Sequence, residues 1–267
     1  MLGNITLGQF VPGDSLVHRL SPISKIIAMI ISAASIMMFP DVTGLLITAG
    51  YILLVAVFTG RTVLFALRGL KPLWILLAFT FLFQSIAIPG ETLFNLGFFD
   101  ISKEGLQKAV FITGKLLFVV LLASIVTLTT SPIALNHGLE RLLNPFKKVG
   151  LPVHELAMMI TIALRFIPIL ITEADIIIKA QKSRGSDMTR GNPVDRVKAL
   201  VPFIVPLLVG SLRRADELAV AMESRCYQGG VGRTTMHQMN MKVIDIAAVT
   251  VSLFYLTLAI TLRLAGW

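Results

Sequence analysis

Charged residues are scarce in this chain of 267 residues, and that scarcity excludes an ordinary water-soluble domain. Lys, Arg, Asp and Glu make up 15% of the chain, whereas typical globular domains carry about 25%. Hydrophobic residues account for 55%, and the mean hydropathy is +0.82. Much of the surface must therefore face something other than water, which predicts an integral membrane protein.

Groups that carry out catalysis are also lacking. The single cysteine, Cys226, excludes an intrachain disulfide framework and a thiolate metal cluster. The histidines are scattered singly, and Glu173 and Asp175 point to different faces of a helix, so neither forms a catalytic cluster. No glycine-rich phosphate loop occurs, so we do not expect this chain to hydrolyse ATP. The sequence predicts a protein that is not an enzyme, without a cofactor or metal of its own.

Apolar runs predict an all-α polytopic protein with five transmembrane helices, at about residues 23–39, 42–60, 73–90, 108–130 and 243–267. Lys25 and Lys115 lie near the ends of two of these runs, where a long side chain can reach the membrane interface. For Lys115, a functional role inside the membrane stays an alternative. Residues 61–71, with three basic side chains, are expected to form a loop.

The distribution of positive charge predicts the orientation. Lys and Arg total 24 against 15 Asp and Glu, and they concentrate at the N-terminus, at residues 61–71 and at residues 141–242. The loops at 40–43 and 91–108 are acidic or mixed. Because basic residues favour the cytoplasmic side, we expect the N-terminus inside and the C-terminus outside a cell membrane.

Residues 131–242 are predicted to form a helical cytoplasmic domain, between spans in 1–130 and a last span in 243–267. Its expected helices are a short one at about 131–148 and two long ones at about 152–185 and 193–228. The first long helix would measure roughly 50 Å, more than the ~30 Å of bilayer hydrocarbon. Both long helices have wide apolar surfaces, which predicts contact with each other and with the lipid interface, the short helix at 131–148 or another hydrophobic protein.

Three prolines lie inside the two long helical patterns, at Pro168, Pro202 and Pro206. Each removes a backbone donor and disturbs the preceding turn. They either bend the helices to follow their neighbours or act as compliant elbows between two halves of each helix.

Both long helices end in a similar signature, Ser183-Arg184-Gly185 in the first and Ser224-Arg225-Cys226 in the second. Gly185 is a natural left-handed terminator, whereas the second helix is expected to stop slightly after Cys226. A single arginine there is usually a solvated residue that interacts with the helix dipole. The duplication favours a binding role, because a guanidinium suits an acidic groove on a partner. Two tips predict a partner with two similar grooves.

The chain resembles the transmembrane T component of energy-coupling factor transporters, the EcfT/CbiQ family, along nearly its whole length. The motifs that carry the resemblance are Pro12-Gly13-Asp14-Ser15 with His18-Arg19-Leu20, Arg165 to Pro168, Ala180 to Gly185, Pro202 to Pro206, and Arg213 to Arg225. It departs from the family at Leu20-Ser21-Pro22-Ile23, where Leu-Asp-Pro-Arg is common, and at Cys226, where Gly is usual.

The resemblance implies a non-catalytic coupling subunit for the uptake of a vitamin or metal ion. Two ABC-type ATPases, of the EcfA and EcfA′ types, would bind ATP and magnesium and dock on Ser183-Arg184-Gly185 and Ser224-Arg225-Cys226. A separate S component would capture the substrate and pack on the apolar side of the long helices, with Pro168, Pro202 and Pro206 at the hinges.

The alternative is a self-sufficient secondary transporter. Such a protein places acids or broken helices mid-membrane and often contains an inverted repeat. We expect the spans to lack Asp and Glu, and the visible repeat lies in the long helices of residues 131–242. These features favour the coupling subunit.

Overall fold

The computed structural model describes residues 10–39, 42–60, 62–88, 92–95, 100–185, 193–229 and 241–264. In these residues the chain is helical apart from one short β hairpin, which confirms the all-α fold class. The chain divides into two compact units. Residues 8–142 with 238–267 form the bundle unit, and residues 1–7 with 143–237 form the arm unit.

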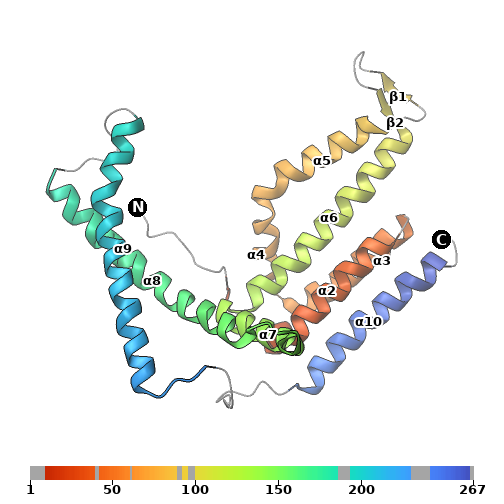
Figure 1. Ribbon diagram of the computed structural model, residues 1–267. Coiled ribbons are helices and arrows are strands. Elements are labelled where there is room, and N and C mark those ends of the chain that lie inside the picture. Colours follow the sequence, from red (N-terminus) through yellow and green to blue (C-terminus); the bar gives the residue numbers. More distant parts are fainter. Residues whose placement is uncertain are drawn as a thin grey trace. The chain divides into compact units, whose positions relative to one another are not determined.

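The bundle unit consists of helices that run largely alongside one another (Figure 1). Its elements are α1 (Leu16–Arg19), α2 (Pro22–Met38), α3 (Val42–Thr59), α4 (Thr62–Gly69), the 3-10 helix η1 (Lys71–Leu73), α5 (Trp74–Ala87), β1 (Thr92–Asn95), β2 (Asp100–Ser102), α6 (Lys103–Thr129), α7 (Pro132–Leu143) and α10 (Val243–Leu264). Helix α6 packs against α2, α3, α4 and α5, while α10 packs along α2. The first and last long helices of the bundle are therefore neighbours.

In the described part of the chain, five helices are long and apolar enough to cross a membrane. They are Val42–Thr59, Thr62–Ala87, Lys103–Thr129, Val153–Ser183 and Val243–Leu264. This confirms a polytopic membrane protein, but the set differs from the predicted one. Helix α2 has 17 residues and is shorter than these five helices. Val153–Ser183 is long and apolar enough to cross a membrane, although it was expected outside the bilayer.

The predicted loop at residues 61–71 is wrong, because Thr62–Gly69 form helix α4. Ala66 in this helix is fully buried and packs with Ile125 and Leu128 of α6. Burial of the apolar face of α4 thus stabilises a helix, where the basic residues on either side had led to the prediction of a loop.

Helix α6 begins earlier than expected, at Lys103, and the hairpin β1–β2 precedes it. The Ser102 hydroxyl accepts a hydrogen bond from the Gly105 N–H at 2.9 Å, as an N-cap does, and donates one to the Ile88 carbonyl at 2.6 Å. A Cβ at Gly105 would lie 2.7 Å from the Ser85 carbonyl oxygen. Glycine here allows the close approach of α5 and α6.

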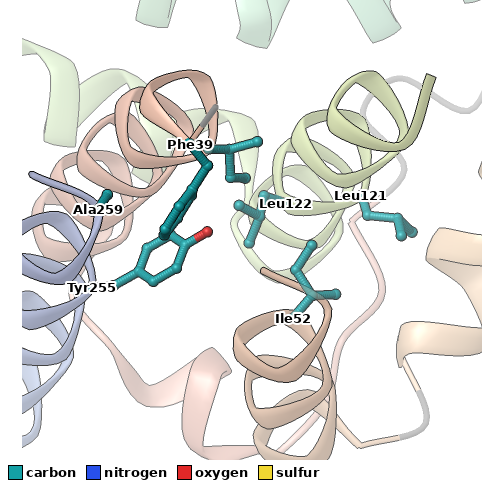
Figure 2. Close-up of a cluster of buried hydrophobic side chains, with 7 residues drawn as sticks. Phe39, Ile52, Leu121, Leu122, Tyr255 and Ala259 are labelled. Carbon is teal, nitrogen blue, oxygen red and sulfur yellow. The ribbon is translucent and has the colours of Figure 1, made fainter. Parts of the chain in front are cut away.

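A cluster of buried side chains holds α2, α3, α6 and α10 together (Figure 2). Tyr255 of α10 faces Phe39 beside α2 and stacks on Tyr51 of α3, with ring centroids 4.4 Å apart. Its hydroxyl and that of Thr48 are hydrogen-bonded at 2.6 Å. The buried phenol thus has the polar partner that its burial requires.

One end of the bundle carries a buried acid and a buried base. The Asp245 carboxylate accepts hydrogen bonds from the Ser21 N–H at 2.6 Å, the Ser24 hydroxyl at 2.7 Å and the Lys242 N–H at 2.8 Å. The Lys25 ammonium donates to the Thr129 carbonyl at 2.8 Å. The anion therefore lies at the N-termini of α2 and α10 and the cation at the C-terminus of α6, which suits all three helix dipoles.

The prediction that Lys25 reaches the membrane interface is wrong, since its exposed fraction is 5%. Lys115 is half-buried, donates to the Met37 carbonyl at 3.3 Å and lies 4.2 Å from the centroid of the Phe111 ring. Both ammonium groups thus contact carbonyls at the C-terminal end of another helix.

The arm unit contains the 3-10 helix η2 (Asn144–Val149) and the long helices α8 (Val153–Ser183) and α9 (Pro193–Ser224). Helices α8 and α9 pack on each other and cross, so their C-terminal tips lie apart (Figure 1). The assignment of residues 131–242 to the cytoplasm stays a prediction.

Candidate docking site

The tip of α8 ends at the predicted residue. Ser183 is its last residue, Arg184 is the C-cap, and Gly185 takes a left-handed conformation with φ of 86°. The Gly185 N–H donates to the Lys182 carbonyl at 3.0 Å, and the Arg184 N–H donates to the Gln181 carbonyl at 3.1 Å. This bonding closes the last turn and leaves the Arg184 side chain exposed at the end of the helix.

The tip of α9 has the same backbone geometry. The Arg225 N–H donates to the Met222 carbonyl at 3.1 Å, and Cys226 has φ of 59°, the one positive value at a non-glycine residue in the described chain. The Cys226 N–H bonds the Glu223 carbonyl, and the Tyr227 N–H bonds the Met222 carbonyl, as in a Schellman motif. The expectation that this helix stops later is wrong, because Cys226 adopts the conformation that glycine takes at the other tip.

The two serines of the signatures bond their own helices. The Ser183 hydroxyl donates to the Lys179 carbonyl at 3.1 Å, and the Ser224 hydroxyl donates to the Ala221 carbonyl at 3.0 Å. Arg184 and Arg225 are both exposed. Each tip therefore offers an outward guanidinium on a rigid helix end, with five donors suited to carboxylates and carbonyls.

The three predicted hinge prolines lie within continuous helices, Pro168 in α8 and Pro202 and Pro206 in α9. Because Pro206 has no N–H, the Pro202 carbonyl lacks its usual donor four residues later. The Gln181 side-chain amide donates to this carbonyl from α8, at 3.3 Å. Gln181 lies three residues before Arg184, so the tip of α8 is joined to the proline segment of α9.

A second polar contact joins the arms further along. Arg214 of α9 and Glu173 of α8 form an ion pair with a nitrogen–oxygen distance of 2.8 Å. Sequence reasoning considered Glu173 only as half of a carboxylate pair and missed this role, as it missed that of Gln181. An acid on a largely apolar helix was the available signal for Glu173.

The remaining surfaces of both arms are strongly apolar. Large exposed hydrophobic side chains on α8 are Leu156, Met159, Ile160, Ile169 and Ile176, and those on α9 include Val201, Ile204, Val205, Leu208, Val209 and Leu212. Exposed apolar side chains in this number on a protein mark contact with lipid or with another protein. The arms thus combine charged tips with apolar flanks.

The described residues contain no group of three or more His, Cys, Asp or Glu side chains that could hold a metal ion. The chemistry available at the tips is that of recognition: permanently charged, directional donors presented at two separated points.

Comparisons with known proteins agree with the motifs. The family model CbiQ, described as cobalt transport protein, matches residues 13–237, which include both tips. The energy-coupling factor transporter transmembrane protein EcfT of Heliobacterium modesticaldum is 50% identical over 247 residues, 92% of this chain and 93% of that protein. EcfT of Acidaminococcus fermentans is 44% identical over 267 residues, covering 100% and 98%. EcfT of Bacillus subtilis is 44% identical over 241 residues, covering 90% and 91%.

Proposed function

This chain belongs to the CbiQ family of cobalt transport proteins, and we propose that it is the membrane-embedded coupling subunit of an energy-coupling factor transporter. In this role it transmits the ATP-driven motion of two ABC ATPases to an S component that takes up a vitamin or metal ion. ATP and magnesium are bound by the ATPases, and this chain has no catalytic activity or cofactor.

The observation that carries the proposal is the matched pair of tips. Two helices end in the same turn, with an exposed arginine at the C-cap followed by a residue of positive φ. An ATPase dimer with two similar acidic grooves is the partner that such a pair fits, because each guanidinium pairs bidentately with a carboxylate. Closure of the dimer on ATP would change the distance between its grooves and so move the tips.

The apolar flanks of α8 and α9 support an S component as the second partner. Two crossed helices cannot cover the hydrophobic side chains of both, and a membrane protein that packs on them would bury that surface. The contacts between Gln181 and Pro202 and between Glu173 and Arg214 keep the crossed arms together, so motion of a tip reaches the apolar flanks.

The arms are better placed at the cytoplasmic surface than across the bilayer. Helix α8 meets the length criterion for a span, but its partner α9 carries Arg213, Arg214, Asp216 and Glu217 within five residues. Four such charges at membrane depth are costly. We infer that α2, α3, α4 with α5, α6 and α10 are the spans, with the N-terminus inside and the C-terminus outside, as the basic residues favour.

Co-purification and transport distinguish this proposal from a self-sufficient secondary transporter. The full chain is expressed with a pair of candidate ATPases and an S component, and each subunit is then omitted in turn. A coupling subunit is expected to co-purify with the ATPase pair and to support uptake into liposomes only in the complete, ATP-supplied complex. Uptake by the chain alone, driven by an ion gradient, would establish the secondary transporter instead.

A further inference from the structure

The bundle unit contains a partly open cavity of about 320 Å³, bounded by α2, α3, α6 and α10 and by the short helix α1. On α10 the lining residues are Ile244, Ala247, Ala248, Val251 and Ser252, which share one face of the helix. The other walls are almost entirely aliphatic and aromatic. Walls of this composition favour an apolar occupant over water, which needs two or more polar partners.

The polar atoms at the inner end of the cavity are bonded to one another. The Tyr51 hydroxyl lies 2.7 Å from that of Ser32 and 3.3 Å from that of Ser252. From Ile244 to Ser252 the α10 wall is about 12 Å long at about 1.5 Å per residue. An apolar cavity of this length and volume suits a hydrocarbon chain.

The other end of the cavity is positively charged. Leu20 and Ile244 line it, and the Asp245 carboxylate bonds the backbone of both Ser21 and Lys242 beside them. This carboxylate brings two exposed cations, Arg19 and Lys242, to the same end of the bundle. Asp245 itself is 2% exposed.

Two further charges belong to this end of the bundle. The Lys25 ammonium is buried and bonded to the Thr129 carbonyl, and Asp14 adds one exposed negative charge five residues before Arg19. The exposed charge of the end is therefore net positive.

We propose that the cavity binds one acyl chain of an anionic phospholipid, with the lipid phosphate at Arg19 and Lys242. A hydrocarbon chain fills the apolar volume with dispersion contacts that an empty cavity would forfeit. The phosphate interacts with Arg19 and Lys242. The neighbouring Asp245 carboxylate already accepts hydrogen bonds from Ser21, Ser24 and Lys242. The site is independent of the arm tips and of the ATPases that we assign to them.

Photolabelling of the purified full chain tests the proposal. The probe is phosphatidylglycerol with a diazirine in one acyl chain, and the labelled peptides are mapped by mass spectrometry. The label is expected on the cavity face of α10, and Ala248→Phe, which fills the cavity, is expected to remove most of it. Ile246→Phe is the matched control, because Ile246 lies on the same helix but is 56% exposed and outside the cavity lining. Equal labelling of the two variants would overturn the proposal.

The headgroup is tested with Arg19→Gln/Lys242→Gln, and Lys108→Gln serves as a control distant from the cavity lining. Because each cation near a membrane surface contributes roughly a factor of five, we expect the double variant to lose about 25-fold of the preference for phosphatidylglycerol over phosphatidylcholine. An unchanged preference would contradict the assignment of the phosphate.

Two controls keep the labelling experiment decisive. Melting temperatures of all variants are measured, and Ala247→Leu replaces Ala248→Phe if that variant does not fold. Labelling is repeated in the complex with the ATPases and the S component, where it is expected to persist. Loss of the label on complex formation would assign the cavity to a partner subunit and overturn the proposal.

Discussion

Glu173 of α8 and Arg214 of α9 form an ion pair at 2.8 Å, with exposed side-chain fractions of 24% and 35%. Gly210, one turn before Arg214, lies against the same carboxylate, since a Cβ there would be 3.1 Å from the Glu173 Oε1 atom. The pair therefore forms where α9 has no side chain to keep α8 away. This relationship fixes the register in which the two arms cross.

We expect Arg214→Met to loosen the crossing and to weaken ATP-driven uptake more than it weakens ATPase binding. A half-buried pair should be worth about 1–2 kcal/mol, between the values for exposed and fully buried pairs. Thermal unfolding of the purified chain measures the first effect, and uptake in liposomes measures the second. Arg213→Met is the matched control at an exposed neighbouring position.

A charge reversal distinguishes the pair from simple packing. Glu173→Arg/Arg214→Glu should recover much of the stability that either single substitution loses, because attraction is restored with the signs exchanged. If the double variant is as unstable as the sum of the single ones, the ion pair does not hold the arms.

Cys226→Gly is expected to stabilise the tip of α9. A non-glycine residue at φ of 59° costs about 1 kcal/mol relative to glycine, and Gly185 at the equivalent place in α8 avoids that cost. The melting temperature of the purified chain should rise for Cys226→Gly and fall for Gly185→Ala. Cys226→Ser keeps a Cβ and therefore the backbone strain, so an equal rise in that variant would show that the thiol, and not the backbone, is responsible.

Arg184→Glu/Arg225→Glu is expected to abolish ATPase co-purification while the chain still inserts in the membrane. Each substitution turns a donor into a like charge facing an acidic groove, so each single variant should weaken the contact at its own tip. Lys147→Glu controls for the loss of positive charge, because Lys147 is exposed but belongs to η2 and not to a tip. Undiminished co-purification with the double variant would remove the arginines from the docking site.

The ends of the arms could be predicted because their signals are local. A Ser-Arg-small sequence at the end of an apolar helical pattern specifies its own turn, and α8 ends where Gly185 predicts. Cys226 misled the prediction for α9, since cysteine rarely takes a positive φ. There the repeated signature was a better guide than residue propensity.

The contacts between elements could not be predicted, because they depend on how distant helices pack. No sequence feature near Gln181 indicates that its side-chain amide bonds the Pro202 carbonyl on the next helix. That carbonyl is available because Pro206 has no N–H to donate to it. Asp245 was overlooked at the start of an apolar run, although it bonds the N-cap residue of α2, 224 positions earlier. The loop predicted around Arg61 failed for the same reason, since α4 is stabilised by burial against α6.

The two lysines within predicted spans should respond very differently to substitution. Lys25→Met removes the donor from the buried Thr129 carbonyl and leaves the Asp245 carboxylate without its nearby cation, which should cost about 2–4 kcal/mol. Lys115→Gln keeps an N–H donor for the Met37 carbonyl at a half-buried position, so its effect should stay within about 0.5 kcal/mol. Thermal unfolding in detergent and uptake by the assembled transporter measure both. A collapse of uptake in Lys115→Gln at unchanged stability would instead establish Lys115 as a functional intramembrane residue.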